Sequence, residues 1–191
     1  KIIEFIKNKG KKTKIISISK NHPIKSVQEA ISCGIKIFGE NRVQEAKNKF
    51  AEIKDINDIE LHLTGPLQTN KIKEALKIFD VFHTLDRKKL IFKLSEHKDL
   101  IKNKKFFIQV NTGKEESKNG IYPEDAEDFL KLCYEMGLKN ILGLMCIPPI
   151  NEDPKKHFML LKKINDNLRL SSLSIGMSGD YDLALEFDPA Y

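Results

Sequence analysis

Short apolar runs alternate along the chain with longer stretches in which apolar residues recur at the helical period. The runs predict strands and the stretches predict helices, because side chains repeat every second residue in a strand and about every 3.6 residues in a helix. The runs are almost continuously apolar, which is typical of parallel strands buried on both faces. After an N-terminal helical segment, the pattern predicts seven strands at residues 14–19, 35–39, 59–65, 80–85, 105–113, 140–149 and 171–179.

Each predicted strand is followed by a predicted helix. The bounds expected for these helices are 24–33, 41–53 and 68–76, then one after residue 86, one from 123, and others at 154–168 and 180–186. Pro23 suits the first turn of its helix, and Gly34 suits a C-terminal cap. Asp86 is a candidate N-terminal cap for the helix that follows it.

Regular alternation of strands and helices predicts a parallel sheet with helical crossovers. Seven units fit either an open doubly wound sheet or a (β/α)8 TIM barrel without its last strand. We favour the barrel, because the chain stops at residue 191, where an eighth strand would begin. One α/β domain is therefore expected over residues 1–191. In both architectures the ligand lies at the carboxyl ends of the strands.

Composition narrows the class of protein. Of 191 residues, 40% are hydrophobic and 31% charged, and Lys plus Arg exceed Asp plus Glu by 33 − 27 = 6. The basic excess is spread along the chain, which argues against a nucleic-acid partner. No apolar run approaches the roughly 20 residues of a membrane span. The three widely spaced cysteines, each in an apolar segment, are expected to be buried and reduced. These features predict a cytoplasmic protein, with a monomer as the default.

Lys20 ends the first predicted strand, in the segment KIISISK. An inward-pointing lysine at the top of a parallel strand would be partly desolvated, and desolvation favours the neutral, nucleophilic amine. Such an amine forms Schiff bases with aldehydes. The alternative is an ordinary surface lysine at a strand end, and position alone does not decide between the two.

Two further segments offer polar groups after strands. In IGMSGD, Met177, Ser178 and Gly179 offer a hydroxyl and backbone N–H groups that suit a phosphate, although Ser178 alone fits a helix cap equally well. In FGENRVQEA, Asn41 is placed either to donate to a ligand or to cap its helix, whereas Arg42, Gln44 and Glu45 are expected to face solvent.

Other fingerprints are missing from the sequence. It contains no GxGxxG, GxxxxGK[ST] or GxSxG segment, and its histidines show no metal-ligand spacing. His62 and His83 lie inside predicted strands, so we interpret them as core histidines whose hydrogen bonds are satisfied.

Six segments in order resemble the pyridoxal phosphate homeostasis protein family. They are SISKNHP, FGENRVQEA, LHLTGPLQTNK, HTLDR, IQVNTGKEESKNG and LSIGMSGDYDLAL, and the resemblance runs from about residue 14 to the end. It implies a single barrel similar to the N-terminal domain of alanine racemase. It also implies that pyridoxal 5′-phosphate binds as a Schiff base on Lys20, with Asn41 and Ser178 in cofactor-site segments and Met177 and Gly179 beside the phosphate.

The resemblance further implies a carrier or regulator of vitamin B6 without strong catalysis, with apo forms of pyridoxal phosphate-dependent enzymes as candidate recipients. A lone barrel lacks the second base that the racemase obtains from another domain. Two alternatives stay open: a weak amino-acid racemase or lyase on the same cofactor, and a barrel that binds another phosphorylated ligand without covalent chemistry.

The sequence departs from the family pattern in two places. Pro66 follows Gly65 where the family usually has His, for which we expect a local change of turn. The chain also stops at Tyr191, just before a segment similar to Arg-Ile-Gly-Thr that supplies phosphate donors and an arginine near the pyridine nitrogen in the family. We therefore expect the given sequence to be truncated at both ends, with the eighth strand missing.

Overall fold

The apolar runs form seven strands that pair in the order of the sequence, and every pairing is parallel. The computed structural model describes residues 2–54 and 58–191. An open doubly wound sheet would reverse its strand order at a switch point, so the sequential order favours a barrel-like sheet. The strands are β1 Ser17–Ile18, β2 Ile37–Glu40, β3 Glu60–Leu63, β4 Val81–Leu85, β5 Lys105–Gln109, β6 Ile141–Met145 and β7 Ser172–Ser174.

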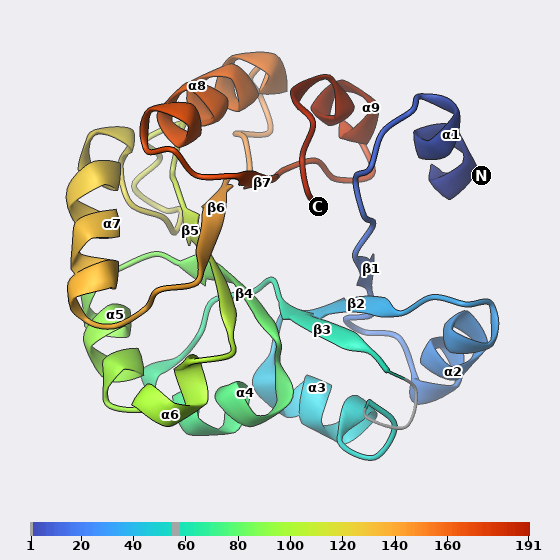
Figure 1. Ribbon diagram of the computed structural model, residues 1–191. Coiled ribbons are helices and arrows are strands. Elements are labelled where there is room, and N and C mark those ends of the chain that lie inside the picture. Colours follow the sequence, from blue (N-terminus) through green and yellow to red (C-terminus); the bar gives the residue numbers. More distant parts are fainter. Residues whose placement is uncertain (1, 55–57) are drawn as a thin grey trace.

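Helices surround the curled sheet, as Figure 1 shows. They are α1 Ile2–Asn8, α2 Ile24–Ser32, α3 Val43–Phe50, α4 Ile72–Ile78, α5 Lys88–Ser95, α6 Lys98–Ile101, α7 Ala126–Glu135, α8 Pro154–Asn167 and α9 Tyr181–Ala184, with 3-10 turns at Thr69–Lys71, Pro123–Asp125 and Leu185–Phe187. Gly34 follows α2 in the left-handed region with φ +84°, as a C-terminal cap requires. At α8, Asp153 Oδ1 accepts a hydrogen bond from the Lys155 N–H at 2.9 Å, and Pro154 begins the helix.

Two local predictions were wrong. Asp86 does not cap α5; its carboxylate accepts a hydrogen bond from the neighbouring Arg87, which is itself the residue before the helix. Cys33 is exposed, because it lies in the cap at the end of α2, whereas Cys133 and Cys146 are buried as expected.

The sheet curls into most of a barrel and leaves a gap between β1 and β7 (Figure 1). Within the described residues seven strands form and no eighth is seen. The last two residues bridge the gap. Ala190 donates its N–H to Leu173 O at 2.9 Å and accepts from Lys14 N at 3.0 Å, and Tyr191 O accepts from Ile175 N at 3.1 Å. Residues 190–191 thus make three backbone hydrogen bonds with residues 173–175 at the β7 edge and one with Lys14, which precedes β1.

The side chains of the strands divide between two layers. One set packs between the sheet and the helices, where Phe38 of β2 contacts Phe50 of α3. A second, smaller apolar cluster consists of Val81, Phe107 and Met145, with Leu142 and Tyr191 packed against it. The alternation of the strands places this second cluster inside the curled sheet. The larger cluster fixes the helices, and the smaller one fills part of the interior.

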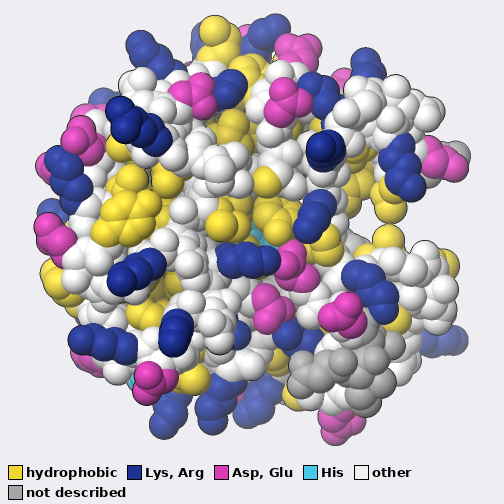
Figure 2. All heavy atoms as spheres, in the orientation of Figure 1, with side chains coloured by type: hydrophobic (Ala, Val, Ile, Leu, Met, Phe, Trp, Pro, Cys, Tyr) yellow, Lys and Arg dark blue, Asp and Glu magenta, His cyan; other side chains and the backbone are white. Residues whose placement is uncertain are grey.

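Charged side chains of both signs are scattered over the face seen in Figure 2, and the cationic ones form no single patch there. In the described part of the chain, no helix has the length and apolar character of a membrane span. The same residues contain no group of three or more His, Cys, Asp or Glu side chains that could hold a metal ion.

Candidate functional site at the carboxyl ends of the strands

The candidate residues follow three different strands at the same end of the sheet. Lys20 comes two residues after β1, Asn41 comes directly after β2, and residues 177–179 come after β7. Because all strands are parallel, these positions share the carboxyl-terminal face. The topology therefore places the predicted amine and the predicted phosphate loop at one end of the sheet.

Lys20 lies in a turn that leaves β1. His22 N donates to Ser19 O at 3.1 Å to close this turn, and Asn21 adopts a left-handed conformation with φ 62°. Lys20 is exposed, so the expectation of partial desolvation was wrong for this chain. The reason is that β1, among the described strands, pairs only with β2, which leaves the turn open on its other side.

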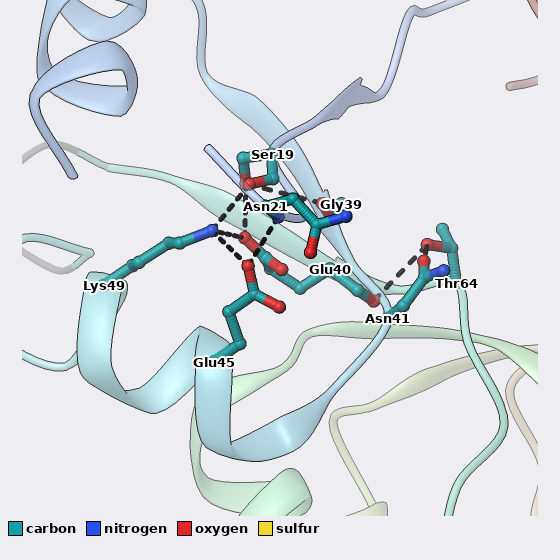
Figure 3. Close-up of polar contacts among 8 residues, drawn as sticks. All are labelled: Ser19, Asn21, Gly39, Glu40, Asn41, Glu45, Lys49 and Thr64. Carbon is teal, nitrogen blue, oxygen red and sulfur yellow. Dashed lines mark hydrogen bonds and ion pairs between the residues drawn. The ribbon is translucent and has the colours of Figure 1, made fainter. Parts of the chain in front are cut away.

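A buried ammonium group holds the two residues that flank Lys20. Lys49 of α3 donates to Ser19 O at 2.6 Å, to Glu40 Oε1 at 2.9 Å and to Glu45 Oε1 at 2.7 Å. Glu45 Oε1 also accepts the Asn21 N–H at 2.7 Å. Figure 3 shows these side chains converging from β2 and α3 on the turn. We call Ser19, Asn21, Glu40, Glu45 and Lys49 the turn clamp.

The charged groups of the turn clamp are largely buried, so each of them depends on a partner of opposite charge. The Glu40 side chain is fully buried; its Oε1 also accepts from Ser19 Oγ at 2.7 Å, while its Oε2 has no partner in the described part of the chain. Burial by itself would lower the pKa of Lys49, but its hydrogen bonds to Glu45 and Glu40 raise that pKa overall. The hydrogen bond from Lys49, aided by the Asn21 N–H, lowers the pKa of Glu45. The cluster therefore holds two carboxylates around one ammonium group.

Asn41 is oriented by a threonine of the neighbouring strand end. Thr64 Oγ1 donates to Asn41 Oδ1 at 2.9 Å, as Figure 3 shows. The carbonyl oxygen of the Asn41 side chain is thus held. Its amide nitrogen has no partner among the described residues and remains available as a donor. Asn41 does not cap α3, because the residue before that helix is Arg42. Of its two predicted roles, the cap was wrong, and donation to a ligand stays a prediction.

The loop after β7 exposes Met177, Ser178 and Gly179. The Met177 N–H is taken by Asp180 Oδ1, and Met177 O accepts from the N–H groups of Asp180 and Tyr181. Within the described residues, the N–H groups of Ser178 and Gly179 and the Ser178 hydroxyl have no partner. A Cβ added at Gly179 would meet nothing within 4 Å, so the loop has open space beside it. These free donors suit an anion such as a phosphate.

The structure brings some of the predicted residues together and leaves others apart. Lys20 and Asn41 follow the paired strands β1 and β2, whose register aligns Ile18 with Gly39. The 177–179 loop follows β7, which is the strand at the other edge of the sheet. No hydrogen bond or ion pair among the described residues links that loop to Lys20 or Asn41.

Sequence reasoning missed most of the turn clamp. Glu45 was expected to face solvent, but it accepts hydrogen bonds from both Lys49 and Asn21. Arg42 and Gln44 are exposed as expected, with Gln44 bonded to Asn48 on the same helix. The spacing of Glu45 and Lys49, four residues apart on a predicted helix, was the available signal.

Comparison with known proteins identifies the family and the fold. Residues 3–186 match the family described as "Alanine racemase, N-terminal domain". The pyridoxal phosphate homeostasis protein of Aquifex aeolicus is 38% identical over 185 residues, which cover 91% of this chain and 80% of that protein.

Two solved structures of PipY from Synechococcus elongatus are also similar. The structure without PLP is 33% identical with a TM-score of 0.82, and the structure with PLP bound is 32% identical with a TM-score of 0.79. Each alignment covers 93% of this chain and 88% of the other. The chain thus belongs to the pyridoxal phosphate homeostasis protein family, within the alanine racemase N-terminal domain fold.

Proposed function

We propose that this chain binds pyridoxal 5′-phosphate in vitamin B6 homeostasis, with the aldehyde held by Lys20 and the phosphate held by the 177–179 loop. The observation that carries the proposal is the placement of an exposed primary amine and a loop with free anion donors on the same face of a parallel sheet. Support comes from relatives named for pyridoxal phosphate homeostasis and from the PLP-bound structure of PipY.

The residues present fit the chemical groups of this cofactor. An aldehyde needs a primary amine, which Lys20 supplies. A phosphate needs N–H and O–H donors, which Ser178 and Gly179 offer without internal partners. The Asn41 amide, whose oxygen is held by Thr64, would offer its N–H groups to a polar group of the ring. When bound, the cofactor supplies an electrophilic carbon that takes up amines.

Lys20 would hold the cofactor covalently. Condensation of its neutral amine with the aldehyde would form a carbon–nitrogen double bond and release the aldehyde oxygen as water. The charged groups of the turn clamp are already paired with one another. Lys20 is therefore the amine of this turn that is left free to react.

The same proposal assigns a carrier role without strong catalysis, in a cytoplasmic monomer, with apo pyridoxal phosphate-dependent enzymes as recipients. The names of the relatives, which describe homeostasis, support a regulatory role. Turnover of amino acids by the loaded protein, measured as racemisation or elimination, would instead favour the weak racemase or lyase.

The test is an absorbance titration of the purified protein with pyridoxal phosphate, before and after borohydride reduction. We expect a visible band that borohydride fixes to Lys20, located by peptide mass spectrometry. Lys20→Ala should lose the band, whereas Lys25→Ala, which alters an exposed lysine of α2, should keep it. No band in the wild type, or an unchanged band in Lys20→Ala, would refute the covalent site.

A further inference from the structure

Lys20 lies in a turn that follows a very short strand, and the backbone holds this turn by the Ser19 N–H to Gly39 O and the His22 N–H to Ser19 O. The strand before it, β1, has two residues in the ladder and pairs with β2. The residue after it, Asn21, adopts φ 62°, which is uncommon for any residue except glycine. A reactive amine on so short a strand needs other contacts to hold its position.

The turn clamp supplies those contacts on both sides of Lys20. Before it, the Ser19 carbonyl accepts from Lys49 Nζ at 2.6 Å, and the Ser19 hydroxyl donates to Glu40 at 2.7 Å. After it, the Asn21 N–H donates to Glu45 at 2.7 Å. One ammonium group, on Lys49, joins both carboxylates, so the two flanks of Lys20 are fixed to the same point of α3.

We propose that Lys49, Glu40 and Glu45 are positioning residues for Lys20, which fix the turn so that its amine meets the aldehyde of the bound ligand. This inference rests on the proposed function and concerns residues that do not themselves touch the ligand. Glu40 needs Lys49, because a buried carboxylate without its cation is strongly destabilising. Glu45 is the more dispensable member for folding, since its side chain is 25% exposed.

The experiment separates the covalent step from ligand binding. One measurement is the rate at which each variant forms the borohydride-reducible band with pyridoxal phosphate. The other is the dissociation constant for 4′-deoxypyridoxine 5′-phosphate, which has a methyl group in place of the aldehyde and cannot react with an amine. A positioning role predicts a loss in the first measurement alone.

For Lys49→Met and Glu45→Ala we expect the rate to fall by about tenfold or more, since misplacing a reacting group by an ångström has effects of that size. The affinity for the deoxy analogue should stay within about twofold of the wild type, because the phosphate and ring contacts are untouched. Glu45→Gln, which keeps an acceptor oxygen for Asn21 and Lys49, should restore most of the rate.

Lys47→Met is the matched control. Lys47 lies on the same helix and forms an ion pair with Glu74 at 3.0 Å, away from the turn. This variant should keep the wild-type rate. In the protein without ligand, amide hydrogen exchange of the 19–22 peptide should be faster in Lys49→Met and Glu45→Ala and unchanged in Lys47→Met.

The outcomes are distinguishable. Wild-type rates in both Lys49→Met and Glu45→Ala would overturn the positioning role and leave the proposed function intact. A parallel loss of analogue affinity would also overturn it, because it would show general support of the site. A wild type that forms no band would refute the proposed function itself. If Lys49→Met does not fold, the rates of band formation in Glu45→Ala and Glu45→Gln are compared instead, and equal rates would overturn the positioning role.

Discussion

His62 Nδ1 and His83 Nε2 lie 2.8 Å apart inside the curled sheet and form the middle of a continuous chain of hydrogen bonds. At one end, His62 Nε2 lies 3.0 Å from Glu60 Oε1, and at the other, His83 Nδ1 lies 2.8 Å from Ser174 Oγ. If the serine hydroxyl donates, each ring donates from Nε2 and accepts at Nδ1, and the chain ends on the Glu60 carboxylate. Both rings are neutral in this arrangement.

Low pH should destabilise the folded protein, because these two rings take up protons more readily in the unfolded chain. Burial holds the pKa of His83 well below its ordinary value, and burial likewise lowers the pKa of His62, against the opposing effect of Glu60. Below pH 6.5 the unfolded chain therefore binds more protons than the folded one, so stability is present above that pH and is lost as the pH falls. We expect the free energy of unfolding to drop by about 1–2 kcal/mol between pH 8 and pH 5.5.

Denaturant titrations at the two pH values measure this loss. His83→Gln should be less stable at pH 8, because it disrupts the chain, but its stability should change less with pH. Glu60 adds a separate loss below pH 4.5, since its hydrogen bond to His62 lowers its pKa. Equal pH slopes for His83→Gln and the wild type would contradict a neutral, buried His83.

Gly65 is required by the close approach of two strand-end turns. A Cβ at this position would lie 2.3 Å from Asn41 O and 2.7 Å from Asn41 Cα, where backbone atoms cannot yield. Gly65→Ala should therefore cost about 1–3 kcal/mol in unfolding free energy and displace Asn41. Gly179→Ala, where a Cβ meets nothing within 4 Å, is the control for stability and should change it by less than about 0.5 kcal/mol. Equal effects of the two substitutions in thermal unfolding would refute this reading.

The general architecture could be predicted because it depends on local patterns. Continuous apolar runs separated by helical periods determine the number of strands and their parallel pairing, and the histidines inside those runs were correctly expected to be buried. Their partners could not be predicted. His62 meets His83 because His62 pairs in register with Val81, and a register is set by the packing of the whole sheet.

The candidate site was predictable to the extent that its residues follow strands. Lys20, Asn41 and the 177–179 loop do so, and the parallel topology places them on one face. The turn clamp could not be predicted in the same way, because it depends on how α3 is rotated against β2. The exposure of Lys20 depends on which strands pair with β1, a property of the assembled sheet rather than of the segment KIISISK.

The three cysteines should react at different rates. Burial raises the pKa of Cys133 and that of Cys146 to about 12, which leaves both thiols protonated and shielded at neutral pH. Cys33 is exposed at the end of α2. A thiol-specific chromogenic reagent at pH 8 should label one thiol rapidly in the native protein, and Cys33→Ser should remove this fast phase. Rapid labelling of further thiols without denaturant would contradict the burial of the other two.

The phosphate assignment can be tested by adding a charge to the loop after β7. Ser178 is exposed and its side chain has no partner among the described residues, so Ser178→Asp should leave the fold intact. A carboxylate there repels a phosphate, and we expect the affinity for pyridoxal phosphate to fall about tenfold or more. Pyridoxal, which has the aldehyde but no phosphate, should react with Lys20 as in the wild type.

Ser171→Asp is the matched control, because Ser171 is exposed just before β7, at the opposite end of the same strand. It should leave both ligands unaffected, since parallel strands place that end away from the proposed site. If Ser178→Asp lowered the affinities for pyridoxal and for pyridoxal phosphate equally, the loop would act on the aldehyde end of the ligand or on the fold. Loss confined to the phosphorylated ligand would instead fix the orientation of the cofactor, with its aldehyde toward β1 and its phosphate toward β7.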